Sequence, residues 1–144
     1  MARKKERPLI GRSEVADFPA LGIFGIEVKI DTGAYNSSIH CEKVRKNKDG
    51  ALEVIFLDTR HPSYTGEKMV FEEFSQKLVR SSNGQAERRY VVTSRIVFPG
   101  RSFELDLSLA NRGDMRFPVL IGRKFLKKQA FLIDPRKKNL LGSA

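Results

Sequence analysis

The sequence has 144 residues, of which 40% are apolar and 31% charged, a composition typical of one soluble globular domain. No apolar stretch approaches the roughly 20 residues that a membrane-spanning helix needs. The basic segment 1–8 is not followed by the apolar run of a secretory signal. The sequence therefore predicts no membrane association, and the cytoplasm is the expected location. The single cysteine, Cys41, excludes an intramolecular disulfide bond.

The net charge of +10 raises the question of an acidic partner. Lysine and arginine are spread along the chain, with small clusters at 3–7, 43–48, 123–128 and 136–138. Basic residues do not alternate with aromatic ones in the manner of RNA-binding segments. The pattern favours a solvated basic surface, so nucleic acid is not an expected partner, while an acidic protein or peptide stays a candidate.

The sequence predicts a flexible basic arm at residues 1–8 and a single domain at residues 9–144. A short strand and a turn at Phe18–Pro19 are expected before Ala20. From Ile26 to Ile30 apolar and charged residues alternate strictly, which indicates a half-buried strand. This strand runs directly into Asp31-Thr32-Gly33-Ala34, and extended chain is expected again over 37–41.

The remaining elements are short and separated by turn signals. Asn83-Gly84 is a strong hairpin signal because both residue types tolerate positive φ. The other predicted strands are 51–57, 68–74, 90–98, 102–109, 119–121, 130–134 and 138–141, with a short helix from Arg123. Many short strands with one short helix predict an all-β barrel.

The Asp31 turn carries the clearest chemistry. An acidic residue at the end of an apolar strand is poorly placed for packing, and Gly33 lets the backbone turn sharply. Such a turn holds a carboxylate at the floor of a cleft. Asp-Thr-Gly is also good turn chemistry in its own right, so a purely structural turn is the alternative.

Asp31–Ala34, together with Pro118-Val-Leu-Ile-Gly-Arg-Lys-Phe-Leu126, resembles the two conserved segments of the retropepsins, the single-domain aspartic peptidases of retroviral type. A closer resemblance covers about Leu9 to Gly142. Its pieces are Ile10–Glu14, Lys29–Ala34, Ser37–His40, Val79–Gly84, Leu109–Met115, Leu120–Arg123 and Asp134–Pro135. They look like a retropepsin-like bacterial and archaeal family labelled "ATP-dependent zinc protease" and associated with RimK-type ATP-grasp ligases that add glutamate to proteins. The resemblance implies a closed retropepsin-like barrel with one short C-terminal helix.

The resemblance also implies an aspartic endopeptidase whose catalytic residues are Asp31, Thr32 and Gly33. An aspartic peptidase needs two carboxylates that share a proton, and the chain has one Asp-Thr-Gly. A homodimer would supply Asp31 twice. Its expected substrate is a protein or peptide, with acidic ones among the candidates. In retropepsins the terminal strands of both subunits interleave, which here would be Pro8–Gly11, Phe131–Asp134 and Asn139–Leu141.

Further roles follow from the same resemblance. Gly122 and Arg123 would support the active-site turn. The expected substrate-binding residues are Ala34, Asn36 and His40 along the cleft, with Ser81, Ser82, Asn83 and Gly84 at the tip of a flap. Tyr35 and Asn36 stand where the viral enzymes have acidic residues that pair with the arginine, so Arg123 is expected to pair with Asp114 or Asp134 instead.

Three alternatives stay open. The barrel could be a non-catalytic module that binds a peptide or nucleic acid, the hairpin could be an ordinary exposed turn, and His40 could be a plain surface or cleft-wall residue. The family label suggests a metal-dependent protease. However, the only histidines are His40 and His61, without H-E-x-x-H or C-x-x-C spacing, and no phosphate-binding loop is present. No metal site and no cofactor are therefore predicted.

Overall fold

The computed structural model describes residues 7–80, 84–111 and 116–141. Its elements, in chain order, are β1 (Leu9–Ile10), β2 (Ser13–Phe18), the 3-10 turn η1 (Pro19–Leu21), β3 (Ile23–Asp31), β4 (Ser37–Lys46), β5 (Leu52–Phe56), β6 (Met69–Phe71), β7 (Ser75–Arg80), β8 (Ala86–Phe98), β9 (Arg101–Ala110), β10 (Val119–Gly122), α1 (Arg123–Lys128) and β11 (Leu132–Ile133). In these residues no helix is long and apolar enough to cross a membrane.

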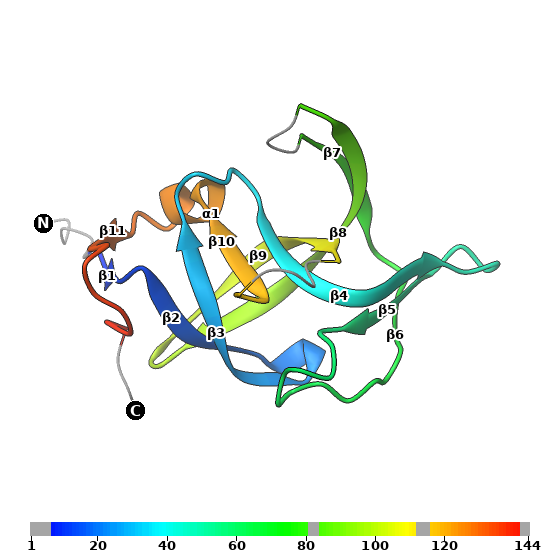
Figure 1. Ribbon diagram of the computed structural model, residues 1–144, viewed down its shortest axis with the longest axis horizontal. Helices are drawn as coiled ribbons and strands as arrows, with labels where there is room; N and C mark the ends of the chain where they lie inside the picture. The colour runs from blue at the N-terminus through cyan, green and yellow to red at the C-terminus, as the bar shows by residue number, and fades with distance from the viewer. Residues whose placement is uncertain (1–6, 81–83, 112–115, 142–144) are drawn as a thin grey trace, which may run out of the picture.

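The fold is a closed all-β barrel, as predicted (Figure 1). Its six strands follow the order β10-β3-β2-β8-β9-β4, and β4 pairs with β10 to close the ring. Two of these pairings, β10 with β3 and β4 with β9, are parallel. The strands β5 and β6 extend the sheet beyond β4. Among the described residues α1 is the one α-helix, and it is the short helix that the sequence predicts.

Alternating apolar residues form the core of the barrel. In β3 the buried side chains include Ile26, Val28 and Ile30, the three that the sequence pattern points inward. In β9 the buried positions include Leu105 and Leu107, again in the predicted phase. A strand that buries one face in this way has its register fixed, because a slip of one residue would expose every apolar side chain.

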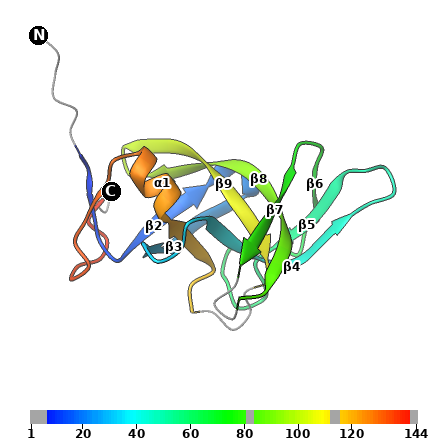
Figure 2. The same cartoon turned by 90° about the horizontal axis from the view of Figure 1, so that it is seen from above.

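The β7–β8 hairpin projects from the barrel, as the two views in Figures 1 and 2 show. The two strands pair antiparallel from Ser75 with Val91 to Arg80 with Ala86, and Gly84 has the positive φ of 82° that the hairpin signal predicts. The strand expected at 68–74 is shorter than predicted, since β6 ends at Phe71 and β7 begins only at Ser75.

The two ends of the chain meet within one molecule. β1 pairs in parallel with β11, with Leu9 opposite Leu132, and the carbonyl of Pro8 accepts a hydrogen bond from the Leu132 N–H. The strand predicted at 138–141 is wrong, because these residues form no strand. The N–H groups of Leu140 and Leu141 donate to the Glu14 carboxylate instead.

Candidate active site

The Asp31 turn lies where β3 ends beside the end of β10. Asp31 is half-buried and stands next to Gly122 in the parallel register. The Gly33 N–H donates to Asp31 Oδ1 at 3.1 Å, and the Ala34 N–H donates to the Asp31 carbonyl at 3.2 Å. Thr32 and Gly33 are exposed. The backbone thus fixes the carboxylate at an open surface and leaves one of its oxygens without a partner from the turn.

The segment after the turn crosses directly over β10. Because β10 lies between β3 and β4 in the barrel, the connection 32–36 has to pass the end of β10. A Cβ on Gly122 would lie 2.5 Å from the carbonyl oxygen of Asn36, so only glycine fits at the crossing. The Ser37 hydroxyl accepts a hydrogen bond of 3.0 Å from the Gly122 N–H. Gly122 therefore packs directly against the segment that follows the Asp31 turn.

Arg123 holds the turn in a way that the sequence reasoning did not foresee. Its Nη1 donates to the carbonyls of Thr32 and Gly33 at 3.4 and 3.3 Å. Its guanidinium lies 5.4 Å from the centre of the Tyr35 ring, within range of a cation–π contact. The expected pairing with Asp134 is wrong, because that carboxylate binds Arg136, and Asp114 lies outside the described residues.

His40 does not join the Asp31 turn. Its side chain is buried, at 2% exposure, and its Nε2 lies 2.8 Å from Asp58 Oδ2. The Arg60 guanidinium beside Asp58 holds the pKa of that carboxyl well below its usual range. Asn36, Ser38 and His40 stand at alternate positions in the chain. However, His40 lies further along β4 than Ser38, beside the loop that follows β5. The expectation that His40 lines the cleft is therefore corrected: His40 is a buried side chain that is hydrogen-bonded to Asp58.

Ala34 and Asn36 are both half-buried beside the turn, and the Ala34 carbonyl accepts a hydrogen bond of 2.8 Å from the Arg123 N–H. Of the four residues expected at the flap tip, Gly84 is exposed in the β7–β8 connection. Ser81, Ser82 and Asn83 lie outside the described residues. Among the residues that the structure describes, no group of three or more His, Cys, Asp or Glu side chains could hold a metal ion.

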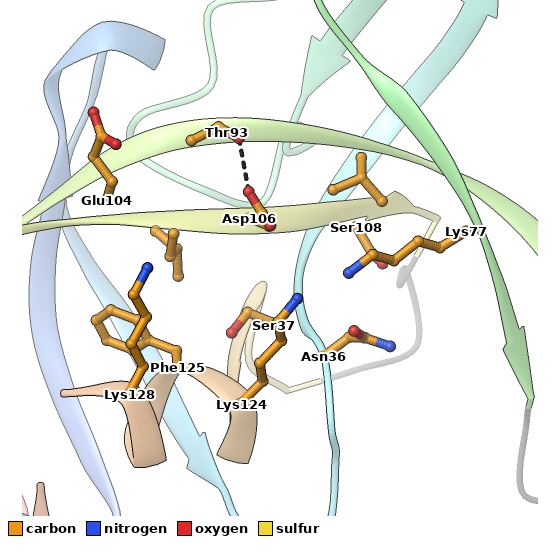
Figure 3. Close-up of a pocket in the computed structure, with 12 residues that line it drawn as sticks. Asn36, Ser37, Lys77, Thr93, Glu104, Asp106, Ser108, Lys124, Phe125 and Lys128 are labelled. Atoms are coloured by element: carbon orange, nitrogen blue, oxygen red, sulfur yellow. Dashed lines mark hydrogen bonds between the residues drawn. The ribbon is translucent and has the colours of Figure 1, made fainter. Parts of the chain in front are cut away.

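A pocket of about 140 Å³ lies beside this turn, between α1, β7 and the inner strands β8 and β9 (Figure 3). Asn36 and Ser37, which follow the Asp31 turn, form one of its walls. Three lysines also line it: Lys77 from β7, and Lys124 and Lys128 from α1. Sequence reasoning missed these lysines as site residues. The basic cluster 123–128 was a signal for two of them, but nothing in the sequence links Lys77 to that cluster.

The comparisons with known proteins agree with this geometry. A sequence model of the RimB-like family, described as retropepsin-like aspartic endopeptidase RimB, matches residues 9–142. Proteins named "Probable alpha-L-glutamate ligase" from Shewanella pealeana and Shewanella halifaxensis are each 35% identical over 139 residues, which is 93% of this chain. A protein of the same name from Desulfotalea psychrophila is 29% identical over 146 residues. The chain spans only about 30% of the length of these relatives.

A solved structure shows a similar fold. It is a Legionella pneumophila protein of unknown function (DUF785), which matches 95% of this chain and 100% of its own with a TM-score of 0.73 and 20% sequence identity. The family match covers nearly the whole chain and includes the Asp31 turn, Gly122 and Arg123. The chain therefore belongs to the RimB-like family of retropepsin-like aspartic endopeptidases.

Proposed function

We propose that this chain is an aspartic endopeptidase of retropepsin type, which hydrolyses peptide bonds as a homodimer. The observation that carries the proposal is the Asp31 carboxylate, held at an open surface by the Gly33 N–H and braced through Gly122 and Arg123. Asp31 is a single carboxylate in the described site, so the second one would come from another copy of the chain. The exposure of Thr32 and Gly33 leaves room for that second turn.

The proposed reaction uses the two Asp31 carboxyl groups in opposite protonation states. The ionised group takes a proton from a bound water, whose oxygen attacks the peptide carbonyl carbon. The protonated group gives its proton to the carbonyl oxygen, which forms a tetrahedral diol. Collapse of the diol breaks the C–N bond as the carboxyl group that took up the water proton gives it to the leaving nitrogen and the other, now ionised, carboxylate takes a proton from one diol hydroxyl, which becomes the new carbonyl oxygen. The charge of each carboxyl group is restored, and no metal is required in these steps.

The substrate proposed is a protein or peptide. The relatives named as glutamate ligases contain this region as less than a third of their length, so a substrate that carries added glutamate is one candidate. The chain's net charge of +10 is suited to an acidic substrate. A binding module without catalysis is the competing function, and the same experiment separates the two.

The test compares wild type with Asp31→Asn in a peptidase assay on a proteome-derived peptide library. The substitution is nearly isosteric but cannot share a proton, so we expect cleavage to fall by at least about 10²-fold while thermal stability stays the same. Asp49→Asn, in an exposed turn of the barrel, is the matched control and should keep full activity. Activity should also survive a strong chelator. Cleavage by Asp31→Asn at the wild-type rate, or loss with chelator and recovery with zinc, would refute the mechanism.

A further inference from the structure

A second cavity, an open groove of about 210 Å³, lies between the Asp31 turn, α1 and the segment that leads into β11. Figure 1 shows α1 next to the β1–β11 pair at one side of the barrel. Three cationic side chains line the groove: Arg7, which precedes β1, and Arg123 and Lys127 of α1. Thr32 adds a hydroxyl-bearing residue. No carboxylate is among the described residues that line this groove, in contrast to the pocket between α1 and β7.

The fold brings these three cations together from separate parts of the chain. Arg123 and Lys127 are four residues apart in α1, a spacing that makes them neighbours on the helix surface. Like charges at this spacing destabilise a helix, and α1 contains no acidic residue that could offset them. The parallel pairing of β1 with β11 carries Arg7 to the same groove. All three residues are exposed, so their charged ends are open to a ligand from solution.

The charge of the groove is not neutralised by ion pairs within the described part of the chain. None of its three cations forms a salt bridge there. Two carboxylates are next to lining residues in the sequence, but neither lines the groove. Asp134 pairs with Arg136. The Oδ1 atom of Asp31 accepts the Gly33 N–H. A bound anion would therefore be the closest negative partner for these cations.

Arg123 retains hydrogen-bond donors for such a ligand. Its Nη1 donates to the carbonyls of Thr32 and Gly33, whereas its Nε and Nη2 have no hydrogen-bond partner among the described residues. A guanidinium with free N–H groups can bind two oxygens of one anion side by side. An anion bound in this way would hold the same guanidinium that supports the Asp31 turn.

The groove suits a phosphate group better than a carboxylate. A carboxylate carries one charge and two oxygens in one plane, whereas a phosphate monoester carries about −1.5 to −2 charges at pH 7 and three acceptor oxygens that point in different directions. Three cations from two separate segments can share such an anion. The volume of about 210 Å³ equals that of roughly seven liquid water molecules, so an organic group can also fit. Its apolar wall consists of Leu126, Ala130, Phe131 and Ile133.

We infer that this groove is a binding site for a phosphate group, held by Arg7, Arg123 and Lys127, either as inorganic phosphate or as the head of a small phosphate ester. The binding itself does not depend on the proposed peptidase activity. Because Arg123 also binds the carbonyls of Thr32 and Gly33, the site is linked to the turn that carries Asp31. In the proposed dimer, bound phosphate would also offset the repulsion between two chains of charge +10 each.

The experiment titrates the full chain with inorganic phosphate, phenyl phosphate and the dicarboxylate glutarate, with chloride adjusted to keep the ionic strength constant. Binding is measured by calorimetry and by the rise in Tm that a ligand of the folded chain causes. The groove variant is Arg7→Met/Lys127→Met. The control, Lys43→Met/Lys46→Met, also removes two positive charges, from exposed positions of β4 that do not line the groove. We expect saturable phosphate binding by wild type and control, and binding at least about tenfold weaker by the groove variant.

The three probes separate the possible ligands. Phenyl phosphate that binds more tightly than inorganic phosphate would assign a phosphate ester, and the opposite order would assign the free ion. Glutarate binding as tight as that of phosphate would overturn the inference. So would the absence of saturable binding of either phosphate probe, or unchanged binding by the groove variant. Urea unfolding checks that the variants fold, and Lys127→Met alone should also weaken binding. None of these measurements uses peptide cleavage, so they stand even if the proposed peptidase activity fails.

Discussion

At the scale of single residues, Tyr35 and Arg123 show how the turn is supported without an acidic partner. The sequence departs from the viral pattern at Tyr35, and the arginine expected to pair with a carboxylate lies over the Tyr35 ring instead. Its Nη1 binds the carbonyls of Thr32 and Gly33, the two residues that follow Asp31. A cation–π contact at an exposed site is worth about 0.5–1 kcal/mol. The position of the guanidinium therefore matters more for the shape of the turn than for overall stability.

Gly122→Ala tests the crossing of the chain over β10. The new methyl group would meet backbone atoms of Tyr35 and Asn36 at about 2.6 Å, so the turn has to shift. We expect a loss of about 1–3 kcal/mol in the free energy of unfolding, and a larger fall in peptidase activity than the stability loss explains. Gly50→Ala is the control, because its Cβ meets open space and only the left-handed backbone is strained. Equal effects of both substitutions on urea unfolding would contradict the crossing argument.

His61 predicts a pH dependence of stability. Burial lowers its pKa below the ordinary value, Arg60 and His40 act in the same direction, and Asp58 opposes them. Below about pH 6.5 the unfolded chain therefore binds a proton at His61 more readily than the folded chain, and the free energy of unfolding declines as the pH falls. His61→Gln should make the change between pH 7.5 and 5.5 smaller in urea unfolding. A pH dependence that is unchanged in the variant would show that His61 does not contribute.

At the scale of elements, Glu14 explains why the end of the chain is not a strand. Its carboxylate is 1% exposed and accepts hydrogen bonds from Gly11, Leu140 and Leu141. The tail also bonds to the chain near β1 and β2, since the Arg12 N–H donates to the Lys137 carbonyl and the Asn139 N–H to the Ser13 carbonyl. A buried carboxylate thus takes the place of a partner strand and satisfies the tail's backbone donors.

Glu14→Gln is predicted to loosen this tail. The amide keeps one acceptor oxygen, but its NH₂ group faces an N–H donor where the second oxygen was. We expect a loss of about 2–3 kcal/mol in the free energy of unfolding, measured by urea unfolding. Faster hydrogen exchange at Leu140 and Leu141 should accompany it. Glu27→Gln, at an exposed position of β3, is the control and should change neither quantity.

Sequence patterns predicted elements well where the signal is local. The alternation in β3 and β9 gave the inward-facing residues, and Asn83-Gly84 gave the β7–β8 hairpin. Patterns failed where a distant group decides the outcome. Leu140 and Leu141 look like a strand, but Glu14, more than 120 residues away, binds their N–H groups. Lys77 and Lys124 meet only because β7 and α1 border the same pocket, a pairing that no local pattern contains.

At the scale of the whole molecule, the structure changes how the proposed dimer should be tested. The terminal segments expected to interleave between subunits pair within one chain, as β1 with β11. Truncation after Pro135 would remove Asn139–Leu141, one of the segments that the resemblance implies would interleave. That truncation would also remove two hydrogen-bond donors from the buried Glu14 carboxylate and so destabilise the barrel itself. A surface substitution is a cleaner experiment.

The final prediction is that the face formed by β1, β11 and the Asp31 turn mediates the dimer. Leu9 and Leu132 are cross-strand neighbours, each 48% exposed, and Thr32 shares a groove with Phe131 and other residues near β11. Two Asp31 turns that face one another would bring these surfaces together, and burial of each leucine would contribute about 1.5–3 kcal/mol. Leu132→Glu should therefore lower dimer affinity and peptidase activity together without unfolding the chain. Val70→Glu, at a position 57% exposed on β6, should change neither. The measurement is analytical ultracentrifugation across a dilution series beside the peptidase assay, and a strictly monomeric chain that cleaves peptides would refute the shared dyad.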